Sequence, residues 1–139
     1  MTETLANVTC VALRGKAVLI AGPPGSGKSS LALALIDRGA QLIGDDGVTL
    51  ERAGDDIVAM PPPNTQGLIE VRNVGLVEMP TTQAPVAIVL RLSPDAERLP
   101  AGHATVDLLG RQVPQVDLYP GTPCLALRAE AALDMHGLD

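Results

Sequence analysis

Short apolar runs separated by glycine, proline and charged residues occur along most of this 139-residue chain, a pattern typical of β-strands. The runs that predict strands are residues 8–13, 17–21, 41–43, 48–52, 57–60, 68–71, 86–92, 104–109 and 113–118. Arg14-Gly15-Lys16 and Ala53-Gly54-Asp55-Asp56 supply turn residues between neighbouring runs, and so they predict two hairpins.

Two other segments have the composition of helices. Residues 29–38 (SSLALALIDR) place Leu31 and Leu35 one turn apart and then reach Gly39, a residue type that commonly ends helices. Residues 125–133 are rich in Ala and Leu and predict a closing helix. Pro61-Pro62-Pro63 excludes regular structure after the second hairpin. Strands therefore outnumber helices, unlike a regular βαβα repeat.

The composition limits the core and the possible partners. Ala, Val, Leu and Ile supply nearly all of the 46% apolar fraction, while Phe and Trp are absent and Tyr119 is the single tyrosine. The core is therefore predicted to be aliphatic. A net charge of −6 at pH 7 opposes binding to nucleic-acid phosphates, and the chain lacks aromatic platforms on which bases stack. We expect no nucleic-acid partner.

The cysteines and the first residues favour a cytoplasmic protein. Cys10 and Cys124 do not have the spacing of a metal site, and we expect free thiols in a reducing compartment, with a disulfide as the alternative. The start MTETLANVTC lacks the basic residues of a signal peptide, and no apolar run approaches the roughly 18 residues of a membrane span. We expect no membrane association.

A phosphate-binding P-loop is the clearest chemical signal in the sequence. Gly22, Gly27, Lys28 and Ser29 match the pattern G-x-x-x-x-G-K-[ST], between a predicted strand and a predicted helix. Glycines let backbone N–H groups approach phosphate oxygens, and the start of the helix adds unpaired donors. The predicted nucleotide-binding residues are Gly22, Pro23, Pro24, Gly25, Ser26, Gly27, Lys28, Ser29 and Ser30.

Two side chains of this loop have further predicted tasks. Lys28 neutralises the β and γ phosphates, and the Ser29 hydroxyl ligates Mg²⁺. The chain is therefore predicted to bind ATP or another polyphosphate with Mg²⁺. The predicted fold class is α/β, a single domain over residues 1–139 with a P-loop core and a mixed, strand-rich sheet. A glycine-rich turn from strand to helix without a ligand is the alternative.

A pair of aspartates follows the strand predicted at residues 41–43. Gly44-Asp45-Asp46-Gly47 has ordinary turn composition, so the local sequence alone leaves a structural turn as an equal alternative. The P-loop favours a chemical role, because Mg²⁺ and a phosphoryl acceptor both need a carboxylate nearby. We therefore predict that this turn faces the phosphate loop.

These features together resemble the HPr kinase/phosphorylase family. In that family a P-loop precedes a helix ending in an Arg-Gly pair and a strand ending in Asp-Asp, similar to Lys28, Arg38-Gly39 and Asp45-Asp46 here. A second family signature, L-E-[IV]-R-G-x-G, is similar to the segment LIEVRNVG at residues 68–75. The resemblance covers about residues 7–133 and is similar to short alphaproteobacterial-type members that lack the family's separate N-terminal domain.

The resemblance implies an enzyme that transfers the γ-phosphoryl group of ATP to a serine of the phosphocarrier protein HPr, and that removes it with inorganic phosphate. Such enzymes regulate carbohydrate metabolism through the phosphotransferase system. Asp45 would be the general base, Asp46 would support it or the metal, and Glu70 would lie near Mg²⁺. Arg72 would hold the loop or a phosphate. For Glu70 and Arg72 an exposed cross-strand ion pair is the alternative.

The sequence also departs from the family pattern. Asn7 stands where the family has a histidine that pairs with the first aspartate, and an amide carries no charge. Residues 113–123, similar to a family segment that presents an arginine-bearing loop, contain no Arg or Lys. Ser30 replaces a common acidic residue. These differences favour reduced activity.

Three functions are consistent with this sequence. The first is the serine kinase/phosphorylase, with an assembly into hexamers that the resemblance implies. The second is a nucleotide-binding regulatory or sensor module with weakened catalysis, which Asn7 and the cation-free residues 113–123 favour. The third is a P-loop kinase with a different acceptor.

Overall fold

A computed structural model describes residues 1–63, 67–121 and 123–139 of the chain. Within these ranges it has two helices, α1 (Lys28–Asp37) and α2 (Leu125–His136). The strands are β1 (Thr2–Ala6), β2 (Thr9–Leu13), β3 (Lys16–Ala21), β4 (Gln41–Gly44), β5 (Gly47–Ala53), β6 (Asp56–Met60), β7 (Leu68–Val71), β8 (Gly75–Glu78), β9 (Ala84–Leu92), β10 (Ala104–Leu108) and β11 (Arg111–Leu118).

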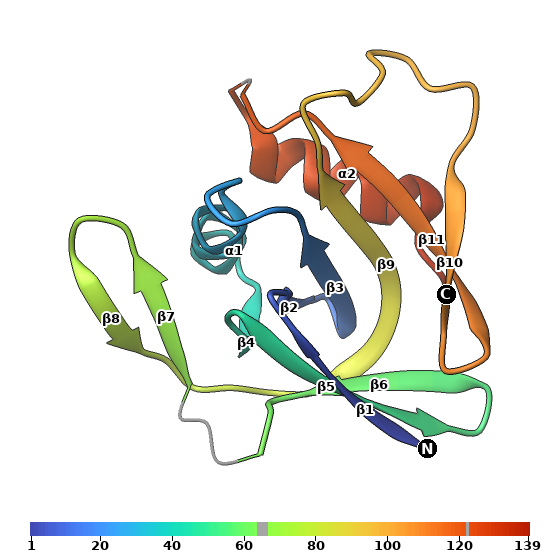
Figure 1. Cartoon of the computed structure of the whole chain (residues 1–139), viewed down its shortest axis with the longest axis horizontal. Helices are drawn as coiled ribbons and strands as arrows, with labels where there is room; N and C mark the ends of the chain where they lie inside the picture. Colours follow the sequence, from blue (N-terminus) through green and yellow to red (C-terminus); the bar gives the residue numbers. More distant parts are fainter. Residues whose placement is uncertain (64–66, 122) are drawn as a thin grey trace.

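The main sheet is mixed and strongly curled. Its strands follow the order β1-β5-β6-β9-β3-β2-β4, and β11 also pairs with β9 and carries β10 on its other edge. β9 joins the two parts, because its first residues pair antiparallel with β6 while its later residues run parallel to β3 and β11. Figure 1 shows the bend of β9 that this double pairing requires.

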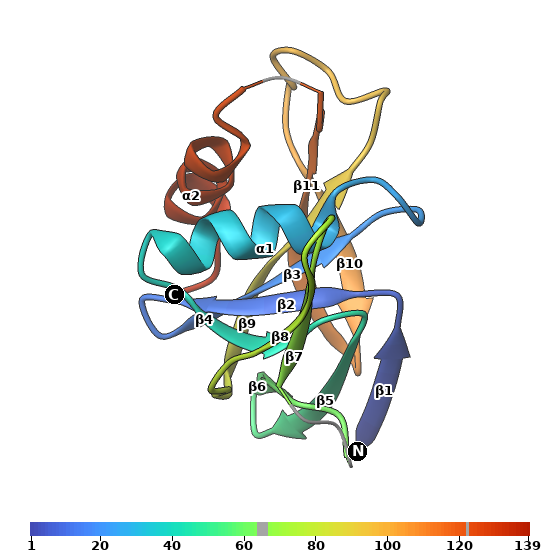
Figure 2. The same cartoon turned by 90° about the vertical axis from the view of Figure 1, so that its left-hand side faces the viewer.

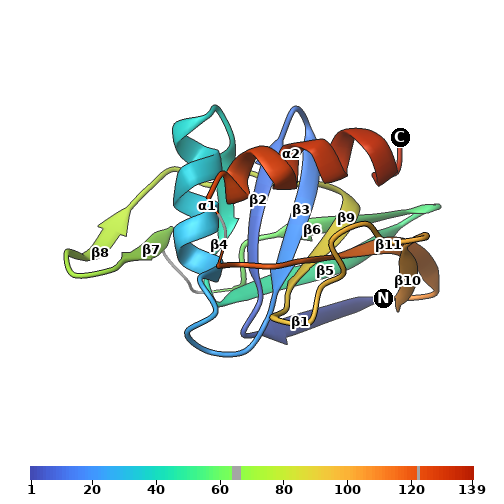
Figure 3. The same ribbon diagram turned by 90° about the horizontal axis from the view of Figure 1, so that it is seen from above.

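The two helices cover one face of this sheet, and the β5–β6 hairpin lies on the other side (Figure 3). Successive residues of β3 contribute to different sides, since Ile20 packs beneath the helices with Leu35 while Leu19 packs with Leu50 on the opposite face. Both clusters are built from aliphatic side chains, which confirms the predicted aliphatic core. The P-loop strand is thus buried on both faces, which fixes its position.

Two strands form a separate hairpin beside α1. β7 and β8 pair antiparallel and protrude from the rest of the molecule (Figure 1), and Ile69 is fully buried against the core below α1. Figure 2 shows the same hairpin crossing in front of α1. The hairpin therefore lies beside the start of α1, where the P-loop ends.

Most predicted elements are confirmed, with ends shifted by a few residues. β2 and β3 form the predicted hairpin, in which Arg14 and Gly15 adopt positive φ angles of 52° and 78°. α1 ends where Gly39 adopts a φ of 108°, as the helix-stop prediction requires. The described residues from Pro61 to Pro63 lie in no helix or strand.

Two strands were missing from the prediction. β1 has a mostly exposed, polar sequence, and it is a strand because its backbone pairs along its own full length with β5, from Thr2 with Glu51 to Ala6 with Gly47. β8 is also largely exposed and pairs only with β7. Neither segment shows the apolar pattern of a buried strand, so pairing with a distant or neighbouring partner decides its structure.

The two cysteines of the chain are not bonded to each other. Cys10 is buried and Cys124 is exposed, and both are free, so the expectation of thiols is confirmed and the disulfide alternative is wrong.

Among the helices of the described residues, none has the length and apolar character needed to span a membrane.

Candidate functional site

The P-loop connects the buried strand β3 to α1, as the sequence predicts. Gly22, Gly25 and Gly27 have φ angles of 152°, 80° and 102°, a region that side chains larger than glycine rarely adopt. A Cβ atom at Gly22 would also lie 2.7 Å from Ser26 Oγ and 3.2 Å from the Leu92 carbonyl oxygen. The start of the loop is therefore packed closely against Ser26 and against the end of β9.

Lys28 is folded back into this loop. Its side chain is buried, and Nζ donates hydrogen bonds to the carbonyl oxygens of Gly22 at 2.8 Å and Pro23 at 3.1 Å. An ammonium group has three protons, so one remains for a further acceptor. A cation is thus held inside the loop, next to the first turn of α1.

Two features of the loop fit a bound phosphate. Ser26 Oγ is buried and has no hydrogen-bond partner among the described residues. Gly27 caps α1 without a side-chain hydrogen bond, so the N–H groups of the first turn are available to a ligand. A hydroxyl, a helix start and an ammonium group converge here, and this set of donors suits an anion.

Asp45 lies across from the P-loop and accepts three hydrogen bonds. Its Oδ1 accepts from Ser29 Oγ at 2.6 Å and from Thr9 Oγ1 at 2.9 Å, and its Oδ2 accepts from the backbone N of Glu70 at 2.9 Å. The donors come from α1, β2 and β7. One carboxylate therefore ties the start of α1 to β2 and to the protruding β7–β8 hairpin.

Asp46 has a different environment. Its residue is exposed, its φ is 60°, and within the described part of the chain its carboxylate makes no hydrogen bond or ion pair. Its backbone is held, because its N donates to Thr9 Oγ1 at 3.3 Å and its carbonyl oxygen accepts from Asn7 N at 3.1 Å. The backbone of Asp46 is fixed while its carboxylate is available.

Glu70 and Arg72 belong to the β7–β8 hairpin, and both are exposed. Glu70 lies in β7, and Arg72 follows in the turn to β8. No salt bridge joins them or involves either residue among the described residues, so the alternative of a cross-strand ion pair is wrong. Both residues line the cavity between this hairpin and the P-loop.

A cavity of about 590 Å³ lies between the P-loop, the aspartate turn and this hairpin. Its lining includes Lys28, Ser29, Asp45, Asp46 and Glu70. Arg72 and Asn7 also line it, as do Pro24, Gly25, Gly27 and Ser30 of the loop, whereas the predicted loop residues Gly22, Pro23 and Ser26 are not among its lining residues. The structure thus brings residues from four separate segments, the start of β2, the P-loop, the aspartate turn and the β7–β8 hairpin, to one space.

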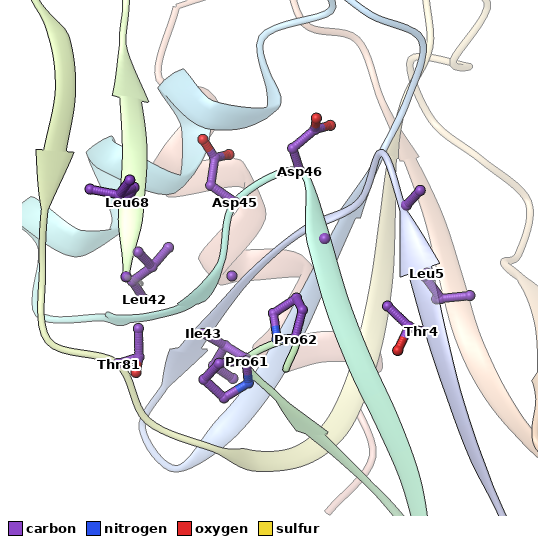
Figure 4. A pocket seen from close by; sticks show the side chains of 14 residues that line it. Thr4, Leu5, Leu42, Ile43, Asp45, Asp46, Pro61, Pro62, Leu68 and Thr81 are labelled. Atoms are coloured by element: carbon purple, nitrogen blue, oxygen red, sulfur yellow. The ribbon is translucent and has the colours of Figure 1, made fainter. Parts of the chain in front are cut away.

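A second cavity of about 600 Å³ lies behind the aspartate turn (Figure 4). Its walls are mainly apolar and include Leu42, Pro61 and Pro62. In Figure 4 the carboxylates of Asp45 and Asp46 point away from these residues. The polar chemistry of the turn is therefore directed to the P-loop side.

Residues 113–123 do not line the P-loop cavity in the part that the structure describes. Cations from other elements reach this segment, however. Arg91 of β9 donates from Nε and Nη2 to the two carboxylate oxygens of Asp117, at 3.0 and 2.7 Å, and this pair raises the pKa of Arg91. Arg128 donates to the Tyr119 carbonyl oxygen at 2.8 Å. Thr122 lies outside the described residues.

Thr9 is the site residue that sequence reasoning missed. It is 1% exposed, and it is one of few buried polar residues in the described part of the chain. The signal in the sequence was a hydroxyl at the start of the apolar strand TCVAL. That signal is weak, because threonine is also common in strands for its shape alone.

Comparisons with known proteins identify a family and a fold to which this chain is similar. The sequence profile of the HPr Serine kinase C-terminal domain matches residues 1–123. The HPr kinase/phosphorylases of Burkholderia cenocepacia (strain HI2424) and Paraburkholderia phymatum are each 37% identical over 144 residues, covering 90% of this chain and 45% of theirs. The chain thus spans less than half the length of these curated relatives.

A solved structure, that of the Hpr(Ser) kinase/phosphatase from Coxiella burnetii, superposes with a TM-score of 0.84. The two sequences are 28% identical, and the match covers 96% of this chain and 90% of the other. The predicted fold class, a P-loop core with a mixed, strand-rich sheet, is confirmed by this match.

Proposed function

This chain belongs to the HPr serine kinase C-terminal domain family, and from that membership we propose that it transfers the γ-phosphoryl group of ATP to a serine of an HPr-like phosphocarrier protein. The reverse transfer to inorganic phosphate is part of the same proposal, as is a role in regulating carbohydrate metabolism. The observation that carries it is the 2.6 Å hydrogen bond from Ser29 to Asp45, which joins the phosphate loop to the acidic turn.

The loop residues bind the nucleotide in this proposal. Lys28 and the backbone N–H groups at the start of α1 hold the phosphates. Ser29 donates its proton to Asp45, which leaves its lone pairs for a cation, and Glu70 supplies a second oxygen from the opposite wall of the cavity. Ser29 and Glu70 would hold Mg²⁺, which neutralises charge on the phosphates when bound.

The two aspartates have different roles in this proposal. The Asp45 carboxylate already accepts hydrogen bonds from three donors. The Asp46 carboxylate, in contrast, is exposed beside the same cavity. We therefore assign the general base to Asp46, and the alignment of Ser29 to Asp45. This assignment differs from the role for Asp45 that the family resemblance implies.

The serine oxygen of the acceptor forms a bond to the γ-phosphorus as the bond from that phosphorus to the bridging oxygen breaks, and ADP leaves. The serine proton passes to the Asp46 carboxylate. In the reverse direction an oxygen of inorganic phosphate forms a bond to the phosphorus of the phosphoserine as the bond from that phosphorus to the serine oxygen breaks. The protonated carboxyl group returns its proton to the serine oxygen, and pyrophosphate leaves.

The test is phosphate transfer from radiolabelled ATP to purified HPr in the presence of Mg²⁺, with Lys28→Ala as the inactive control. Asp46→Asn should lower the rate by roughly 10²- to 10⁴-fold, the usual contribution of a general base, and leave nucleotide affinity nearly unchanged. No transfer above the Lys28→Ala control would refute the kinase. Tight ATP binding with no transfer would instead support the regulatory module.

The sequence adds three expectations to this proposal. They are assembly into hexamers, a cytoplasmic location and an activity lowered by the amide at Asn7, which lines the cavity without a side-chain hydrogen bond among the described residues. Sedimentation tests the assembly. Asn7→His should raise the rate of transfer if the missing imidazole limits it.

A further inference from the structure

One buried hydroxyl contacts both aspartates of the proposed site. Thr9 Oγ1 donates to Asp45 Oδ1 at 2.9 Å and accepts from the backbone N of Asp46 at 3.3 Å. A hydroxyl has one proton and two lone pairs, so its proton is committed to one aspartate while a lone pair serves the other. Thr9 thus links the side chain of Asp45 to the backbone of Asp46.

The backbone at Asp46 needs such support. Its φ of 60° lies in the left-handed region, which residues other than glycine adopt rarely and keep only when surrounding contacts hold them. The segment that contains Thr9 supplies these contacts, because Asn7 N also donates to the Asp46 carbonyl oxygen at 3.1 Å. Both polar groups of the Asp46 peptide backbone are therefore bound by residues just before or at the start of β2.

Thr9 is itself fixed by the sheet. It opens β2, pairs with Ile20 near the end of the P-loop strand β3, and is 1% exposed. Ile20 stands two residues before Gly22, where the phosphate loop begins. The position of the hydroxyl is thus set by the same strand pair that sets the position of the loop.

We propose that Thr9 is a positioning residue, whose hydroxyl holds the Asp45–Asp46 turn at the correct distance and angle from Ser29 and the P-loop. This inference deepens the proposed function and rests on it, because the turn matters only if its carboxylates act on the bound nucleotide and acceptor. Thr9 touches neither substrate in this scheme. It acts through Asp45, which shares its Oδ1 with Thr9 and Ser29, and through the backbone of Asp46.

A comparison of four residue types at position 9 separates the effect of the hydroxyl group from the effect of side-chain shape. Threonine and valine share one shape and differ by the hydroxyl, and serine and alanine form a smaller pair with the same difference. The variants are Thr9→Val, Thr9→Ser and Thr9→Ala. The matched control is Thr49→Val, because Thr49 is also a buried strand threonine with a side-chain hydrogen bond, to Thr4 Oγ1, and does not line the P-loop cavity.

Two readouts are measured on each variant. The first is the Mg²⁺ concentration that gives half-maximal binding of a fluorescent, non-hydrolysable ATP analogue, with melting temperature recorded alongside. The second is kcat and KM for phosphate transfer to HPr. Misplacing a reacting group by about 1 Å can cost roughly 10²-fold, so we expect kcat to fall roughly ten- to a hundredfold in Thr9→Val, with KM for ATP changed less than threefold.

The expected pattern follows the hydroxyl. Thr9→Ser retains the kcat and the Mg²⁺ requirement of the unmodified protein, while Thr9→Val and Thr9→Ala both lose kcat and need several-fold more Mg²⁺. Thr49→Val changes neither. Thr9→Val with unchanged kcat and Mg²⁺ requirement would overturn the proposal, and so would Thr9→Ser as impaired as Thr9→Ala, because packing would then be the cause.

The Mg²⁺ titration keeps this inference separate from the proposed function. If the unmodified protein labels no acceptor, the kinase proposal fails, but the titration still shows whether the Thr9 hydroxyl positions the turn relative to Ser29. If Thr9→Val does not fold, the serine and alanine variants give the same comparison, since they differ by the hydroxyl alone.

Discussion

Replacing Asp45 with asparagine tests whether one carboxylate joins the β7–β8 hairpin to the P-loop. The hairpin is a separate two-stranded sheet, and the bond from Glu70 N to Asp45 Oδ2 is its hydrogen bond to the aspartate turn. An asparagine has one acceptor oxygen in place of two. If that oxygen faces the hydroxyls of Thr9 and Ser29, the amide NH₂ group faces the Glu70 N–H.

The size of the effect follows from this geometry. A donor that loses its acceptor costs about 1–3 kcal/mol when it is buried. Glu70 is exposed, so water replaces part of the lost bond, and we expect the lower end of that range. About 1 kcal/mol corresponds to roughly a fivefold increase in the opening of the hairpin at Glu70.

Amide hydrogen exchange followed by NMR measures this opening residue by residue. In Asp45→Asn we expect the Glu70 amide to exchange roughly fivefold faster, and nucleotide binding to need more Mg²⁺ because Ser29 loses a charged acceptor. Asp107→Asn is the control, since Asp107 Oδ1 accepts from Gly110 N at 2.9 Å in an exposed turn. Unchanged exchange at Glu70, with faster exchange at Gly110 in the control, would refute the reasoning.

Three other predictions concern stability and reactivity. Gly44→Ala would place a Cβ atom 2.1 Å from the Gly47 carbonyl oxygen, so the aspartate turn must shift, and urea unfolding should show a loss of about 1–3 kcal/mol. Hydrogen bonding from Arg38 lowers the pKa of Glu130, so Arg38→Gln should reduce stability at pH 7 and match the unmodified protein once the pH falls below that lowered value. Burial raises the pKa of the Cys10 thiol, so this thiol should not react with a thiol reagent in the native protein. Its contribution to stability should be lost as the pH rises above the pKa that the thiol has in the unfolded chain.

Each of these predictions has an internal comparison. Gly102→Ala meets open space at an ordinary φ and should leave stability nearly unchanged. High salt should weaken the effect of Arg38→Gln, because the ion pair is exposed. Cys124 is exposed and should react in the native protein, and equal reaction at both cysteines would contradict the burial of Cys10.

Local features of the site could be predicted from the sequence because neighbouring residues decide them. The P-loop needs glycines at positions of positive φ and a lysine at the start of a helix, and all of these lie within a few residues of one another. The Arg14-Gly15 hairpin and the end of α1 at Gly39 are local in the same sense. Hydrophobic runs likewise predicted most of the strands, since burial on one or both faces leaves an apolar pattern.

The arrangement around Asp45 could not be predicted in this way. Its partners Ser29, Glu70 and Thr9 are 16, 25 and 36 residues away along the chain, and they come from three different elements. A hydrogen bond between such residues exists only when strand pairing and helix packing bring the elements together. The same holds for the pair of Arg91 with Asp117, which two parallel strands create.

The edge strand β1 shows why the hydrophobic pattern does not predict a strand that forms only by pairing with a partner strand. Its polar sequence becomes a strand only because β5 offers a full row of backbone partners. The phosphate loop, in contrast, could be predicted from the sequence, because its chemistry and its backbone angles are properties of one short segment. Which aspartate is held and which is left available depended on the packing of β2, α1 and β7 around one turn, because only tertiary contacts bring those donors within hydrogen-bonding distance.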